Sequence, residues 1–193
     1  MPYYKRLVGK LCYLSPRDPE DCKDLAGWLN DVETSMNMSI RIGPNEVNER
    51  GVVEGWLKAG YHGFAIVDLT TDRHIGDCGL HDIDWVNRTA SFGIMIGEKA
   101  YWGKGYGTEA TRLILDYGFN ILNLESVRLQ VKEFNKRGVR AYEKAGFQRF
   151  GIQRKETFFS QKGWDVANMD ALAEEFDSPY IKGMMDNILN GSI

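Results

Sequence analysis

The sequence predicts a single α/β domain in which helices flank a mixed central sheet of about seven strands. Three observations lead to this prediction. The length of 193 residues suits one domain that buries a sizeable core. Segments of strand-like and helical periodicity alternate along the chain. A glycine-rich stretch, WGKGYGT at 102–108, joins an apolar strand-like run to a long amphipathic helix.

The N-terminal half is expected to fold into one short strand, two helices and an antiparallel meander of three strands. The first strand ends at Ser15-Pro16, and the first helix carries small or apolar residues at i, i+3, i+4 and i+7. A polar connection over 31–44 separates the helices, and turn residues separate the last three strands. The predicted elements are strand 10–14, helices 20–29 and 46–57, and strands 63–69, 74–84 and 89–96.

The C-terminal half continues with alternating helices and strands. Helix 108–122 has an apolar stripe at helical period, which predicts that one face packs against the sheet. Helix 136–145 follows strand 126–131 and ends at Gly146, a typical C-cap residue. Two final strands, 147–153 and 165–172, complete the order β-α-α-β-β-β-α-β-α-β-β.

Composition disfavours several classes of protein. Apolar residues make up 43% and charged residues 26%, as in ordinary globular proteins, and the net charge of −3 disfavours a nucleic-acid partner. No apolar run approaches about 18 residues and no signal-peptide pattern is evident, so we expect no membrane partner. Three cysteines without C-x-x-C spacing are expected to be reduced thiols of a cytoplasmic protein with no metal site: Cys12, Cys22 and Cys78.

The glycine-rich stretch predicts a binding site for phosphate groups. Glycines at 103, 105 and 107 let the backbone approach a ligand and point successive N–H groups the same way. The following helix N-terminus adds partial positive charge. A P-loop needs Lys and Ser/Thr directly after its last glycine, whereas Thr108-Glu109 stand here, and the G-x-G-x-x-G spacing of a dinucleotide fold is also missing.

The loop and a second motif together resemble the GNAT acyltransferases. Gly105 and Gly107 fit the pyrophosphate loop [QR]-x-x-G-x-[GA], with Trp102 where Gln or Arg is usual. The stretch NKRGVRAYEKAGF at 135–147 resembles the second GNAT signature. Residues 84–173 resemble the RimJ/RimL-like and spermidine N-acetyltransferase branch.

The resemblance implies the GNAT fold and transfer of acetyl from acetyl-CoA to a primary amine. It also implies direct attack in a ternary complex, with acetyl-CoA as co-substrate and no metal. A non-catalytic acetyl-CoA-binding module is the alternative from another class, and a P-loop nucleotide-binding protein is a third.

Family motifs assign the expected site residues. Tyr142 is the expected general acid, which would protonate the departing CoA thiolate. Asn135 suits both an N-cap and a bond to the pantetheine arm, and the sequence does not separate these roles. The residues expected to bind acetyl-CoA are Ile94, Met95, Ile96, Trp102, Gly103, Lys104, Gly105, Tyr106, Gly107, Thr108, Asn135, Arg140, Tyr142 and Lys144.

The general base is not visible at either position where this family often carries glutamate. Ser91 and Gln130 stand there instead. The remaining candidates are His81, Asp82 and Asp84, acting directly or through a water molecule.

The acceptor is expected to be a small-molecule or peptide amine, either a protein N-terminus or a polyamine-like compound. Residues 31–46 are expected to border its pocket. Four acids would suit a cationic acceptor: Asp31, Glu33, Asp82 and Asp84.

A short extension, residues 174–193, follows the domain expected over 1–173. A helix over 180–189 would place six apolar residues on one face: Tyr180, Ile181, Met184, Met185, Ile188 and Leu189. A helix of about ten residues is marginal alone, so this face is expected to dock. We expect it to cover its own domain or the rim of the acceptor site, or else to contact a second subunit, which leaves a monomer or a homodimer open.

Overall fold

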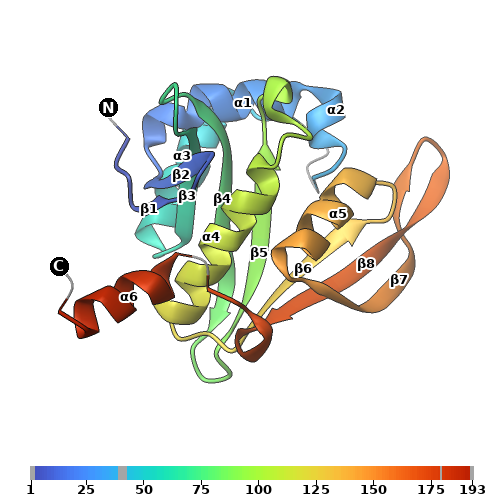
Figure 1. Ribbon diagram of the computed structural model, residues 1–193. Coiled ribbons are helices and arrows are strands. Elements are labelled where there is room, and N and C mark those ends of the chain that lie inside the picture. Colours follow the sequence, from blue (N-terminus) through green and yellow to red (C-terminus); the bar gives the residue numbers. More distant parts are fainter. Residues whose placement is uncertain (1–2, 39–42, 179, 192–193) are drawn as a thin grey trace.

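The computed structural model describes residues 3–38, 43–178 and 180–191, and it confirms an α/β fold built on one mixed sheet. The sheet has eight strands in the order β1-β2-β3-β4-β5-β6-β8-β7 (Figure 1). The strands are β1 (Leu7–Val8), β2 (Cys12–Pro16), β3 (His62–Asp68), β4 (His74–Asp84), β5 (Thr89–Ile96), β6 (Ser126–Lys132), β7 (Gln148–Phe159) and β8 (Lys162–Leu172). The helices are α1 (Cys22–Asn30), α2 (Val32–Ser35), α3 (Glu46–Lys58), α4 (Tyr106–Asn120), α5 (Lys136–Ala145) and α6 (Ile181–Leu189).

One parallel pair of strands interrupts an otherwise antiparallel sheet. Strands β3 to β5 form the predicted three-strand meander, which β2 and β1 extend antiparallel, and β6, β8 and β7 also pair antiparallel. Between these groups, β5 and β6 pair only from Thr89 with Ser126 to Ser91 with Arg128. Beyond Ser91, the edge of β5 that faces β6 is therefore unpaired, and the two strands separate.

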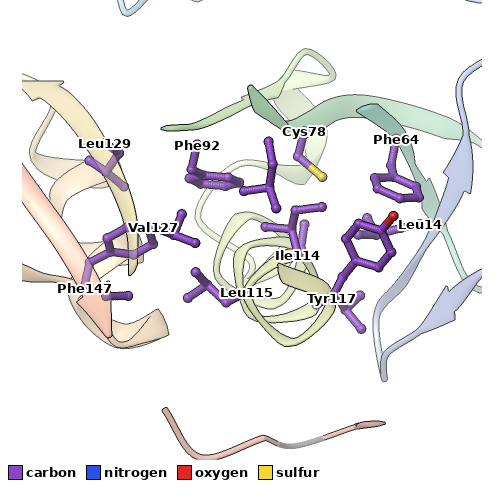
Figure 2. Packing of buried hydrophobic residues seen from close by; sticks show 14 of the residues in the cluster. Leu14, Phe64, Cys78, Phe92, Ile114, Leu115, Tyr117, Val127, Leu129 and Phe147 are labelled. Atoms are coloured by element: carbon purple, nitrogen blue, oxygen red, sulfur yellow. The ribbon is translucent and has the colours of Figure 1, made fainter. Parts of the chain in front are cut away.

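The two faces of the sheet are covered by different helices. On one face α4 packs against the centre of the sheet, where Figure 2 shows Ile114 and Tyr117 among core side chains such as Phe64 and Phe92. On the other face, α1 and α3 form a smaller cluster around Met95. Alternate residues of β5 therefore point to opposite helical layers.

The first strand differs from its prediction. Strand β2 begins at Cys12 rather than at residue 10, and β1 precedes it. Residues 9–11 form the turn between them, because the Glu109 carboxylate accepts backbone N–H groups from Lys10, Leu11 and Cys12 at 2.6–2.9 Å. This contact joins positions about one hundred residues apart in the chain, so local periodicity does not reveal it.

Several other boundaries also differ. The polar connection contains α2, which Asp31 caps by accepting the Thr34 N–H, while residues 39–42 lie outside the described part. Helix α4 begins at Tyr106 instead of residue 108 because Gly105 serves as its N-cap. The last two strands extend through 154–159 and 162–164 as a hairpin, since backbone pairing carries the strands through a polar stretch.

The C-terminal helix docks through its first turn only. The Asp116 carboxylate accepts the N–H groups of Tyr180 and Ile181, both at 3.0 Å, and the Ser178 hydroxyl at 2.6 Å. Ile181 is buried against the α4 core. The expectation that the whole apolar face is covered is wrong within this chain, because four of its residues are exposed: Met184, Met185, Ile188 and Leu189. The domain division after residue 173 stays a prediction.

In the described part of the chain, no helix has the length and apolar character needed to cross a membrane.

Candidate functional site

The glycine-rich loop adopts a backbone that favours glycine. Gly103 has φ of +73° and Gly105 has φ of +97°, in the left-handed region. The first turn of α4 closes with a bond from the Glu109 N–H to the Gly105 carbonyl. The N–H groups of 106–108 therefore precede the intrahelical bonds and carry the positive end of the helix dipole. This arrangement suits a phosphate group.

A cavity of about 270 Å³, the first cavity, lies between this loop, β5 and α5. Twelve of the fourteen predicted cofactor residues line it: Ile94, Met95, Ile96, Trp102, Gly103, Gly105, Gly107, Thr108, Asn135, Arg140, Tyr142 and Lys144. The other two do not line it. The Lys104 side chain is exposed, and the Tyr106 hydroxyl donates to Asp68 at 2.6 Å.

Arg137 is a lining residue that the sequence reasoning missed. Its guanidinium lies 3.6 Å from the ring centroid of Trp102, and the Trp102 indole N–H donates to the Ile96 carbonyl at 2.7 Å. Trp102 therefore holds a cation beside the loop, although it stands where Gln or Arg is usual. Arg137, Arg140 and Lys144 are spaced at i, i+3 and i+7, which places three cations on one face of α5. This spacing was visible in the sequence and would have predicted Arg137 as a lining residue.

Tyr142 lies where β5 leaves β6. Its ring packs edge-on against Phe92, with centroids 6.2 Å apart, and against Phe147 at 6.0 Å. Burial raises the pKa of Tyr142 to about 12. No described residue hydrogen-bonds to its hydroxyl, so this group is protonated and has its donor free.

Asn135 takes the N-cap role that its position predicted. Its side-chain oxygen accepts the Gly138 N–H at 2.9 Å at the start of α5. Because Asn135 also lines the first cavity, its amide nitrogen is available to a ligand there.

A larger cavity of about 850 Å³, the second cavity, lies on the α1 and α3 side of the sheet. It shares Met38, Ile94 and Met95 with the first cavity. The two cavities thus meet along β5. Within the segment 31–46, which was expected to border the acceptor, Met38 and Pro44 line the second cavity.

A row of glycines makes room for the second cavity. Gly63, Gly79 and Gly93 are paired in register across β3, β4 and β5. A Cβ on Gly63 or Gly79 would lie 2.7–2.9 Å from the Tyr61 ring, so these two positions accommodate that ring. A Cβ on Gly93 would meet only His81 Nε2, at 3.9 Å. The floor at Gly93 is therefore open.

The candidate bases separate into two groups. His81 and Asp82 line the second cavity, with His81 Nδ1 2.8 Å from Asp82 Oδ2. Since Asp82 orients Nδ1, His81 Nε2 is left facing Gly93. Asp84 instead accepts the backbone N–H groups of Val86 and Asn87 in the turn after β4, so it is not a suitable base.

Asp31, Glu33 and Gln130 lie outside both cavities. Asp31 and Glu33 both bind Lys99 Nζ, at 2.9 and 2.8 Å, and neither lines a described cavity. Gln130 donates to the amide oxygens of Gln153 and Asn168. The acids that do line the second cavity, besides Asp82, are Glu49 and Asp77, which the sequence reasoning missed.

Known proteins match both the sequence and the fold. The family described as acetyltransferase (GNAT) domain matches residues 12–148. A probable N-acetyltransferase YjcK of Bacillus subtilis is 42% identical over 162 residues, covering 77% of this chain and 87% of that protein. A spermidine N(1)-acetyltransferase of Vibrio cholerae is 28% identical over 155 residues, covering 71% of this chain and 89% of its own length.

A solved structure supports the same assignment at the level of the fold. The spermidine N-acetyltransferase from Vibrio cholerae in complex with CoA and spermine aligns with a TM-score of 0.79 and 24% identity, over 86% of this chain and 98% of that one. The family match itself spans more than half of the present sequence. This protein therefore belongs to the GNAT family of acetyl-CoA-dependent N-acetyltransferases.

Proposed function

We propose that this enzyme transfers acetyl from acetyl-CoA in the first cavity to a primary amine in the second cavity, by direct attack within a ternary complex. The observation that carries the proposal is the contact between the two cavities along β5, where Met38, Ile94 and Met95 line both. Two substrates entering from opposite faces of the sheet would meet where β5 and β6 separate.

Acetyl-CoA fits the first cavity through charge and backbone geometry. The loop 103–108 supplies N–H groups for the pyrophosphate, and Arg137, Arg140 and Lys144 add positive charge on the facing helix. The unpaired edge of β5 offers backbone partners to the pantetheine amides. On this binding mode, the thioester comes within reach of Tyr142, which lines the first cavity.

The reaction then needs one base and one acid. His81 Nε2 removes a proton from the acceptor ammonium beside Gly93, and Asp82 stabilises the resulting imidazolium. The amine nitrogen attacks the thioester carbon, so a C–N bond forms and the C–S bond breaks. Tyr142 protonates the departing thiolate. The nitrogen then loses its second proton to solvent, from which Tyr142 is reprotonated. The products are the acetamide, free CoA and one proton.

His81 also weakens the alternative of a non-catalytic binding module. That alternative was favoured by the lack of a glutamate at positions 91 and 130, where Ser91 and Gln130 stand. A histidine held by Asp82 in the second cavity supplies the missing proton acceptor. A cytoplasmic location and a monomeric or homodimeric state stay predictions.

Two glycine substitutions test the separate cavities. Gly107→Val points a side chain into the first cavity, where its Cβ would meet only Ile96 at 3.8 Å, and Gly93→Val fills the open floor of the second. We expect Gly107→Val to lose acetyl-CoA binding by calorimetry. Gly93→Val should bind acetyl-CoA normally and lose turnover of amines in a thiol-release assay.

The wild-type protein provides the decisive comparison. It should release CoA only when an amine is present. Tight acetyl-CoA binding without CoA release across monoamines, polyamines and peptides with free N-termini would support the binding module instead.

A further inference from the structure

The second cavity contains one carboxylate that the protein does not itself pair. Glu49 lies in the first turn of α3, is 5% exposed and lines this cavity. No described residue hydrogen-bonds to its carboxylate. Burial raises the pKa of Glu49, and the nearby Arg17 opposes that rise. An unpaired buried carboxylate is costly, so the site favours an incoming group that carries positive charge or donates hydrogen bonds.

The basic group next to Glu49 forms its ion pair with Asp77 and not with Glu49. Arg17 is the one lysine or arginine among the described residues that line the second cavity, and its Nε lies 2.7 Å from Asp77 Oδ1. Its guanidinium also lies 4.9 Å from the Trp56 ring. Asp77 Oδ2 in turn lies 3.2 Å from His74 Nε2, so the Asp77 carboxylate is paired with both Arg17 and His74. Glu49 is the carboxylate left for a ligand.

Glu49 and the proposed base come from different elements that line the second cavity. Glu49 lies on α3, whereas His81 lies on β4 and Gly93 on β5. No hydrogen bond or ion pair between described residues joins Glu49 to His81 or Asp82. A cation that pairs with Glu49 is therefore taken to be a different group from the amine that reacts beside His81.

The wall of the second cavity is largely apolar. It includes Leu29, Val52, Trp56 and Met95. Such a wall suits methylene groups and offers little to a chain of peptide groups, each of which needs hydrogen-bonding partners.

We propose that Glu49 binds a second, non-reacting amine of the acceptor, so that this enzyme acts on diamines or polyamines in which a methylene chain separates two ammonium groups. This proposal rests on the proposed function, because it takes the second cavity as the acceptor site. Of the two acceptors expected from the sequence, the proposal favours the polyamine-like compound over the protein N-terminus. It assigns this preference to Glu49.

The test compares three acceptors and three proteins by steady-state kinetics; the acceptors are diaminobutane, butylamine and a peptide with a free N-terminus. Diaminobutane and butylamine share a methylene chain and differ in the second amine. For the wild type, we expect the diamine to have the lower KM. Glu49→Gln keeps the side-chain size and removes the charge, and it should raise the diamine KM about tenfold to a hundredfold, the range for loss of a charge-assisted hydrogen bond. The kcat and the butylamine KM should change less than about threefold.

Glu46→Gln is the matched control. Glu46 lies in the same first turn of α3 but is exposed, so its substitution should leave both KM values unchanged. Glu49→Met repeats the test with an apolar side chain of similar length if Glu49→Gln proves unstable. Thermal melting of each variant verifies folding.

The outcomes separate this proposal from the proposed function. An equal fall in kcat for both amines, with KM unchanged, would mean that Glu49 acts on the reacting amine and would overturn the anchor role. Preference for a peptide N-terminus over the diamine would also overturn it. Diamine binding by calorimetry that depends on Glu49, without CoA release, would preserve the anchor and refute the catalytic function.

Discussion

Replacing Tyr142 by phenylalanine isolates the proposed acid. The hydroxyl has no described hydrogen-bond partner, so its removal breaks no protein hydrogen bond and leaves the ring packing against Phe92 and Phe147. The free energy of unfolding should therefore change by less than about 1 kcal/mol. A general acid contributes about 10²–10⁴-fold to the rate, so kcat should fall by at least the lower figure.

The assay must measure the chemical step. Thiol release should be followed in single turnovers at saturating acetyl-CoA and amine, with acetyl-CoA affinity measured separately. Tyr117→Phe is a suitable control, because it also removes one hydroxyl, which contacts His62 away from both cavities. A rate loss under threefold for Tyr142→Phe, with the control equally affected, would mean that Tyr142 only packs. Because burial raises the pKa of Tyr142 to about 12, its deprotonation should not limit the rate below pH 10.

Three further predictions concern the base, the pH dependence of stability and the tail. His81→Ala should lower kcat at neutral pH about 10²-fold or more. This loss of rate should become smaller as pH rises, because a larger fraction of the acceptor is then free amine. Adding Ser91→Glu to the His81→Ala variant should restore part of the rate. Burial opposes a charge on His74, but Asp77 and neighbouring acids raise its pKa to about 9, above the unfolded value of 6.5. Its contribution, of order 3 kcal/mol, should be present below pH 6.5 and lost towards pH 9 in denaturant titrations, and His74→Phe should flatten that trend. Deleting residues 178–193 removes groups that donate hydrogen bonds to Asp116, so we expect the free energy of unfolding to fall by roughly 3 kcal/mol and Tm by about 6–12 °C. The mass per particle in light scattering should not change beyond the loss of the deleted residues. A deletion that halves the particle mass would instead show a dimer contact.

The first cavity was largely predictable because most of its lining comes from two short segments, 94–108 and 135–144, that each carry a recognisable motif. A strand, a glycine-rich turn and a helix N-terminus follow one another over 92–108, and this backbone arrangement suits a phosphate group. The direction of the Lys104 side chain was not predictable in the same way. Its charge lies in the right loop, but side-chain direction depends on Gly103 and Gly105 having positive φ, and the cations that line the cavity come from α5 instead.

The second cavity was not predictable, because no local pattern describes it. Arg17, Glu49, Asp77 and Gly93 come from four separate segments, and only the tertiary fold brings them to one cavity. Acids that looked suitable by type are engaged by local partners: Asp84 in its own turn and Asp31 at a helix cap. Residue type indicates what a side chain is able to do, whereas pairing decides whether it is free to do it.

The position of the base illustrates the same distinction within the site. Ser91 occupies a β5 position where this branch often carries glutamate, and it is paired in register with His81 on β4. Directly opposed residues in an antiparallel pair point to the same face, with Cβ atoms about 4.5–5.5 Å apart. A proton acceptor moved from one strand to its neighbour therefore serves nearly the same point in space. The bulge that follows His81 places Asp82 against Nδ1, which leaves Nε2 directed at the open floor of Gly93. On the proposed mechanism, His81 therefore takes the proton close to the point that a carboxylate at position 91 would reach.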